Sequence, residues 1–209
     1  MPSLAKIIDR IAQKFIRDPA GMGRPVPKEA FDDEYRSGRW DHFEGPEETP
    51  RNVVLAGLVA DRFKAPSVLD VGCGSGRLAM IYQAHPFTRY TAVDVSVEGL
   101  RKAQSLGLAR VDFLEADFES WRPAGAFDAI IFNESIGYAR DPAAVLADFA
   151  AHHDPDGLFF LSHFRTGNFG AFWRRIERVC EILFSTSVTS GSGKVWDIKV
   201  LRPRPSPRN

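Results

Sequence analysis

The chain has 209 residues, of which 44% are hydrophobic and 26% charged, and this predicts one folded domain with a sizeable core rather than a disordered chain. Its formal net charge is zero, so the overall charge provides no attraction to the phosphates of a nucleic acid. The two cysteines, Cys73 and Cys180, lack the spacing of a zinc site and fit a reducing compartment. No apolar run is long enough to span a membrane and no signal-peptide pattern is present, so we expect a cytoplasmic protein without membrane or nucleic-acid partners.

Residues 1–45 are predicted to form a helical cap in front of the main domain. Residues 3–17 have apolar side chains at helical spacing with basic ones between them, which predicts an amphipathic helix. We expect its apolar stripe to pack against the domain or a second copy, and a membrane surface is the alternative. Residues 18–27 contain three prolines and two glycines and predict a loop. Residues 31–44 are rich in aromatic and charged side chains, typical of a binding surface or of a staple onto the domain.

From residue 46 to residue 201, helical and strand patterns alternate in the way of a doubly wound α/β sheet. Helical patterns cover residues 47–63, 78–84, 98–106, 141–151 and 174–179. Strand patterns begin at residue 67 and then cover residues 89–94, 111–118, 127–133, 158–163, 180–189 and 194–201. The last two strands flank a Ser-Gly-Ser-Gly turn, which predicts an antiparallel hairpin. The proline-rich tail, residues 202–209, is expected to be disordered.

A glycine-rich turn follows the strand that begins at residue 67. Gly72, Gly74 and Gly76 alternate there, and three residues without a Cβ let the backbone approach a bound ligand closely. In the dinucleotide-binding fingerprint the third glycine comes three residues after the second, where this chain has Arg77. The turn therefore predicts a nucleotide-like ligand and disfavours a nicotinamide cofactor.

The segment from Val68 to Gly76 resembles the first motif of the class I S-adenosylmethionine-dependent methyltransferases, and the resemblance extends over about residues 50–201. It implies a seven-stranded, mostly parallel, Rossmann-like sheet with a terminal antiparallel hairpin, and S-adenosylmethionine as the cofactor. It also implies that residues 31–44 fold over the cofactor as a lid, as the N-terminal segment does in many small-molecule methyltransferases.

Acidic residues follow the next strands at the edge where such a fold binds its ligand. Asp94 closes the strand 89–94, where a carboxylate accepts hydrogen bonds from ribose hydroxyls. By resemblance, Asp117 accepts from the adenine amino group between Val95 and Phe118, although a surface aspartate in a turn is the alternative. The candidate cofactor-binding residues are Asp70, Gly72, Cys73, Gly74, Gly76, Asp94, Val95, Asp117, Phe118, Asn133, Arg51, Tyr35 and Trp40. By resemblance, Arg51 meets the methionine carboxylate, and a solvated surface arginine is the favoured alternative.

Three further residues are candidates for catalysis. Glu134 and His163 each follow a central strand, so a base that holds or deprotonates the acceptor is expected there, and Tyr138 is expected to line the acceptor pocket. A hydrogen-bonded structural histidine is the alternative for His163. Asn133 is not followed by the Pro-Pro-aromatic sequence of enzymes that methylate nucleobases or glutamine, which disfavours those acceptors. We expect no metal site, since Asn133 stands where metal-dependent relatives have an aspartate.

The sequence as a whole predicts methyl transfer from S-adenosylmethionine to nitrogen or oxygen of a small molecule by a monomer or homodimer. A nicotinamide-dependent oxidoreductase and a catalytically silent, cofactor-binding regulator of the same fold are the alternatives. No sequence motif specifies the acceptor.

Overall fold

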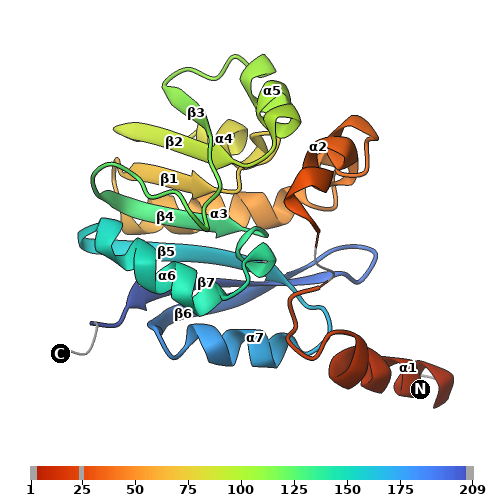
Figure 1. The fold of residues 1–209 in the computed structure, drawn as a ribbon. Coiled ribbons are helices and arrows are strands. Elements are labelled where there is room, and N and C mark those ends of the chain that lie inside the picture. The colour runs from red at the N-terminus through yellow and green to blue at the C-terminus, as the bar shows by residue number, and fades with distance from the viewer. Residues whose placement is uncertain (1–3, 24–25, 206–209) are drawn as a thin grey trace.

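The computed structural model describes residues 4–23 and 26–205, and a single seven-stranded sheet forms the centre of the molecule (Figure 1). The strands are β1 (Ser67–Val71), β2 (Arg89–Asp94), β3 (Val111–Glu115), β4 (Phe127–Asn133), β5 (His153–Phe164), β6 (Cys180–Thr189) and β7 (Val195–Pro203). The α-helices are α1 (Leu4–Ala12), α2 (Lys28–Arg36), α3 (Thr49–Arg62), α4 (Arg77–Tyr82), α5 (Val97–Ser105), α6 (Pro142–Phe149) and α7 (Phe169–Ile176). A π-helix, η1 (Gln13–Arg17), and 3₁₀ turns at Asp41–Glu44, Ile136–Tyr138 and Ala150–His152 complete the elements.

The strand order is β3-β2-β1-β4-β5-β7-β6. The strands β1 to β5 run parallel, whereas β7 is antiparallel to both β5 and β6. The order reverses between β1 and β4, and this is the place where open α/β sheets bind ligands. The predicted doubly wound sheet with a terminal hairpin is therefore confirmed.

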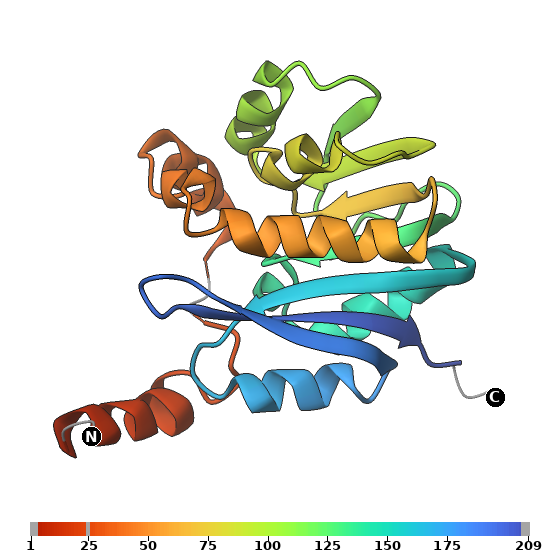
Figure 2. The same ribbon diagram turned by 180° about the vertical axis from the view of Figure 1, so that it is seen from behind.

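Helices cover both faces of the sheet, as Figures 1 and 2 show from opposite sides. Because side chains alternate along a strand, Val68 of β1 packs beneath α3 and α4, while Leu69 packs beneath α6 and α7. All five residues of β1 are buried. A strand buried on both faces reads as a continuous apolar run, which is why β1 and β4 were recognisable in the sequence.

Two boundaries differ from the predicted ones because of tertiary contacts. β5 begins at His153, five residues before the predicted start at Leu158: His153 pairs with Phe127, and the register then shifts so that Leu158 pairs with Ala129. α7 begins at Phe169, not at residue 174. Two of its aromatic residues, Phe172 and Trp173, are buried in the core and do not line a substrate cavity.

The C-terminal strand is longer than predicted. β7 continues to Pro203, so residues 202–203 belong to the sheet and not to the tail, and residues 206–209 lie outside the described part of the chain. Arg202 pairs with Glu181 of the neighbouring strand, so the ladder between β7 and β6 extends to the start of β6.

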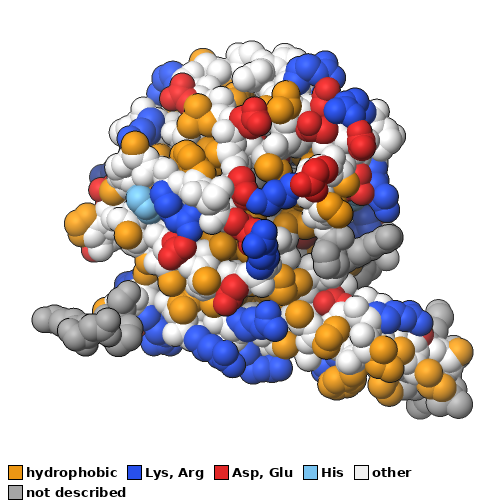
Figure 3. All heavy atoms as spheres, in the orientation of Figure 1, with side chains coloured by type: hydrophobic (Ala, Val, Ile, Leu, Met, Phe, Trp, Pro, Cys, Tyr) orange, Lys and Arg blue, Asp and Glu red, His pale blue; other side chains and the backbone are white. Residues whose placement is uncertain are grey.

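The first helix projects from the body of the domain beside α7 (Figures 1 and 2). Two apolar side chains of α1, Ile8 and Ile11, and two of the following π-helix, Phe15 and Ile16, are more than half exposed. They belong to the apolar surface at the lower right of Figure 3. The stripe was predicted to pack against its own domain or a second copy. For these residues the first is wrong, and packing against a second copy stays a prediction. Within residues 4–23 and 26–205, no helix has the length and apolar character needed to cross a membrane.

Candidate functional site

The glycine-rich turn connects β1 to α4 at the carboxyl edge of the sheet. Gly72, Gly74 and Gly76 have φ angles of 74°, 55° and 77°, a region that other residues adopt only at a cost. A Cβ at Gly72 would overlap the side chain of Ser135, and one at Gly74 would overlap the Tyr35 hydroxyl. Both the backbone conformation and the close packing therefore require glycine in this turn.

Asp94, at the end of β2, is held under the same turn. Its Oδ2 accepts a hydrogen bond from the Gly74 amide at 2.8 Å, and its Oδ1 accepts one from the Ser96 amide at 2.9 Å. The side chain is buried, and this burial raises the pKa of the carboxyl above its ordinary value. Each oxygen keeps a lone pair for a further donor, which suits a ligand with two neighbouring hydroxyl groups.

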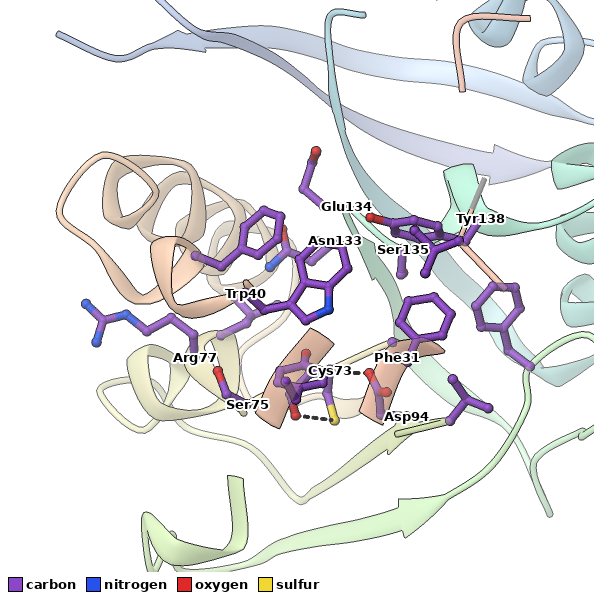
Figure 4. Close-up of a pocket in the computed structure, with 18 of the residues that line it drawn as sticks. Phe31, Trp40, Cys73, Ser75, Arg77, Asp94, Asn133, Glu134, Ser135 and Tyr138 are labelled. Carbon is purple, nitrogen blue, oxygen red and sulfur yellow. Dashed lines mark hydrogen bonds between the residues drawn. The ribbon is translucent and has the colours of Figure 1, made fainter. Parts of the chain in front are cut away.

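A cavity of about 150 Å³ lies over the turn and is walled by the ends of β1, β2 and β4 and by the N-terminal segment (Figure 4). It brings together thirteen of the predicted site residues: Tyr35, Trp40, Arg51, Gly72, Cys73, Gly74, Asp94, Val95, Asp117, Phe118, Asn133, Glu134 and Tyr138. Residues from five separate stretches of the chain thus converge at the switch point of the sheet.

Three predicted residues do not line this cavity. Asp70 is fully buried in β1, where it accepts a hydrogen bond from the Tyr90 hydroxyl, and burial raises its pKa to about 7. Gly76 faces Ala103 of α5. His163 lines a second, adjoining cavity, where its Nε2 bonds the Gly21 carbonyl oxygen at 2.6 Å and its ring stacks on Phe172.

The N-terminal segment covers the turn through α2. Asp32 Oδ1 accepts hydrogen bonds from the Ser96 hydroxyl at 2.6 Å and from the Glu98 amide at 3.2 Å, and the bond from Ser96 is the main reason that its pKa is lowered. Arg36 pairs with Glu98 at 3.3 Å. These contacts attach α2 to the start of α5 and bring Tyr35 against the glycine-rich turn.

Lys28, at the start of α2, is a site residue that the sequence did not reveal. It forms an ion pair with Asp117 and lies 4.0 Å from Glu119. Asp117 Oδ1 also accepts from the Glu119 amide at 3.0 Å. The expected adenine-binding carboxylate is therefore tied to the N-terminal segment.

A buried polar network forms the opposite wall. The Arg51 guanidinium donates to Glu48 Oε2 at 3.0 Å and also to the Asn133 side chain, and both Arg51 and Glu48 are only 3% exposed. Asn133 in turn donates to Asn52 Oδ1 at 2.7 Å. The predicted basic residue is thus present at the cavity, with its charge balanced by a carboxylate from the same helix end.

Further lining residues were not predicted: Val26, Lys28, Phe31, Phe43, Asn52, Ser75, Arg77, Leu78, Glu119 and Ser135. Phe31 and Phe43 lie in the aromatic stretch 31–44, and their rings belong to a cluster with Trp40 and Tyr138. Ser135 has a recognisable signal, because a glycine at position 72 leaves room for a neighbour. Lys28 has none.

Comparisons with known proteins agree with this geometry. A family model described as a methyltransferase domain matches residues 4–178. A protein of Azoarcus sp. (strain BH72) called trans-aconitate 2-methyltransferase is 35% identical over 98 residues, which are 46% of this chain and 38% of that protein. An Escherichia coli O139:H28 protein of the same name is 30% identical over 118 residues, 56% of this chain and 46% of that protein. The chain thus spans less than half the length of these curated relatives.

Solved structures show the same fold. The N-methyltransferase NodS of Bradyrhizobium japonicum WM9, crystallised with S-adenosyl-L-homocysteine, has a TM-score of 0.65 at 14% identity, covering 93% of this chain and all of NodS. A Pyrococcus horikoshii OT3 protein has a TM-score of 0.68 at 18% identity, covering 83% of this chain and all of that one. At these identities the likeness concerns the fold.

Proposed function

Because this chain belongs to the class I S-adenosylmethionine-dependent methyltransferase family, as the match over residues 4–178 shows, we propose that it transfers a methyl group to nitrogen or oxygen of a small molecule. The observation that carries the proposal is the pairing of the glycine-rich turn with Asp94 at the switch point of the sheet. S-adenosylmethionine supplies, when bound, a methyl group already activated on a sulfonium.

The residues at the cavity suit this cofactor. The Asp94 carboxylate has lone pairs free for the two ribose hydroxyls, and Gly72 and Gly74 of the turn line the cavity beside it. Asp117 lines the cavity together with Val95 and Phe118, and these three residues suit the adenine. Arg51 and Asn133 border the methionine end, Tyr35 and Trp40 cover the site, and Asp70 supports the turn from below.

Methyl transfer from a sulfonium is an in-line displacement, so this chain contributes mainly alignment and exclusion of water. The aromatic side chains of the N-terminal segment cover the cavity, and α2 is attached to α5 by hydrogen bonds and ion pairs. Glu134 and Tyr138 stand at the side of the cavity away from Asp94 and suit the acceptor. His163, bonded to the Gly21 carbonyl, suits a positioning role in the second cavity.

Titration calorimetry with S-adenosylmethionine, S-adenosyl-L-homocysteine and NAD tests which cofactor the protein binds. We expect heat from the first two and none from NAD; the reverse result would favour an oxidoreductase. Incubation with methyl-labelled S-adenosylmethionine and a set of small acceptors, trans-aconitate included, tests the transfer. Binding without label in any product would point to the silent regulator.

A further inference from the structure

A second cavity adjoins the first and shares Phe43, Glu134 and Tyr138 with it. Its volume is about 230 Å³, and it lies between the ends of β4, β5 and β7 and the segment around Met22. Trp196 of β7 forms part of the wall on the hairpin side. The shared wall places this cavity where an acceptor can reach the methyl donor's pocket.

Glu134 is fixed in that shared wall. Its φ of 62° is unusual for a residue with a side chain and is strained, so the surroundings must hold it. Oε1 lies 3.0 Å from the Ser162 hydroxyl, and Oε2 accepts from the Phe164 amide at 3.0 Å. Figure 4 shows the carboxylate pointing away from Cys73 and Asp94. Each oxygen retains a lone pair for a ligand.

Glu134 has no direct ion-pair partner among the described residues, and the Arg51 guanidinium reaches it only through the Ser162 hydroxyl, to which it donates at 3.4 Å. In the described ranges, no lysine, arginine or histidine nitrogen lies within 4.0 Å of its carboxylate. The other acid at the second cavity, Glu48, pairs with Arg51 at 3.0 Å, and Lys194 at its mouth pairs with Glu47 at 3.0 Å. The cavity thus presents a net negative charge at Glu134.

Aromatic rings surround this carboxylate. Phe43 and Tyr138 stand on the side of the first cavity, and Phe164 and Trp196 on the other. The faces of such rings attract cations, and a carboxylate among them favours a positively charged nitrogen while repelling an anion. We infer that the second cavity is the acceptor site for an amine, with Glu134 as the residue that binds the reacting nitrogen; this rests on the proposed methyl transfer.

The chemistry of the step agrees with the position of Glu134. The amine binds as an ammonium ion and first loses one proton to water. The neutral amine then donates an N–H to the carboxylate, and its lone pair forms the bond to the methyl carbon while the electron pair of the carbon–sulfur bond stays on sulfur. The positive charge moves to the nitrogen, beside Glu134, and the methylammonium product then releases a proton to water. A carboxylate placed where positive charge develops lowers the barrier.

The test compares amines with carboxylates of the same carbon skeleton, for example 2-phenylethylamine with phenylacetate, in a panel that also contains aliphatic pairs and trans-aconitate. Binding is measured calorimetrically with S-adenosyl-L-homocysteine present, and turnover by label transfer. We expect at least one amine to bind and react more than about tenfold better than its carboxylate partner.

Glu134→Gln keeps the size of the side chain, can still accept from the Phe164 amide through its amide oxygen, and removes the charge. We expect it to lower kcat/KM for the amine by about tenfold or more while the Kd for S-adenosylmethionine changes less than about twofold. Glu181→Gln, at an exposed ion pair on β6, is the control and should change neither. Amines that perform no better than carboxylates, or a fully active Glu134→Gln, overturn the inference. Absence of S-adenosylmethionine binding in the wild-type protein overturns the proposed function instead.

Discussion

The buried carboxyl group of Asp70 predicts a pH-dependent stability. Asp70 lies in β1 directly before the glycine-rich turn, is fully buried, and has one oxygen, Oδ1, without a hydrogen-bond partner among the described residues. The Tyr90 hydroxyl donates to the other oxygen at 2.9 Å. Burial disfavours the charged form and raises the pKa of Asp70 from 3.8 to about 7.

The sign follows from the proton balance. Below about pH 4 the carboxyl is protonated in both states, and its favourable contribution is complete. As pH rises towards 7, the unfolded chain releases this proton while the folded protein keeps it, so the free energy of unfolding falls. The slope is 1.36 kcal/mol per pH unit until the folded carboxyl itself ionises near pH 7, so the loss between pH 5 and pH 7 is about 2 kcal/mol.

Asp70→Asn removes the titrating group and still accepts the Tyr90 hydrogen bond through its amide oxygen. We measure the free energy of unfolding by urea titration at several pH values. Between pH 5 and pH 7 we expect that of the variant to fall by about 2 kcal/mol less than that of the wild type. Asp112→Asn, at an exposed carboxylate of β3, is the control and should follow the wild type. Parallel curves for Asp70→Asn and the wild type would refute the reasoning.

Three further predictions concern the site. Asp94→Ala should weaken S-adenosylmethionine binding by about tenfold or more in calorimetry with an unchanged circular-dichroism spectrum; full affinity would place the ribose elsewhere. Gly74→Ala should lower the free energy of unfolding by about 1–3 kcal/mol, because its φ is 55° and the new Cβ meets the Tyr35 hydroxyl. Adding Tyr35→Phe to Gly74→Ala should restore part of the lost free energy of unfolding in urea titrations. If the double variant recovers none of it, a clash with the Tyr35 hydroxyl is excluded as the cause. Arg51→Ala should cost about 3–5 kcal/mol by leaving Glu48 buried without its partner. Adding Glu48→Gln to Arg51→Ala should recover part of the lost free energy of unfolding. An unchanged loss would show that the buried Glu48 carboxylate is not its cause.

The strands and helices were predictable where the local pattern of apolar and polar residues reflects which side chains are buried. β2 and β4 have the predicted bounds, and the helix expected at residues 98–106 is present as α5, with Ser96 as its N-cap accepting from the Gly99 amide. The start of β5 was not predictable, because His153 joins the sheet only through pairing with Phe127 across a register shift. The start of α7 at Phe169 was missed because the burial of Phe172 and Trp173, which packs this part of the helix onto the core, is known only from the structure.

By itself, the sequence determined those parts of the site that depend on the backbone: a strand, a turn of alternating glycines and an acid at the end of the next strand. Positive φ and strand periodicity leave a signal in the residue types of a few consecutive positions. Only the tertiary structure decided which side chains are paired. Lys28 meets Asp117 across 89 positions, Arg51 is neutralised by Glu48, and Glu134 has no direct ion-pair partner among the described residues. The balance of charge in a cavity is a sum over residues from distant parts of the chain, and no local pattern records it.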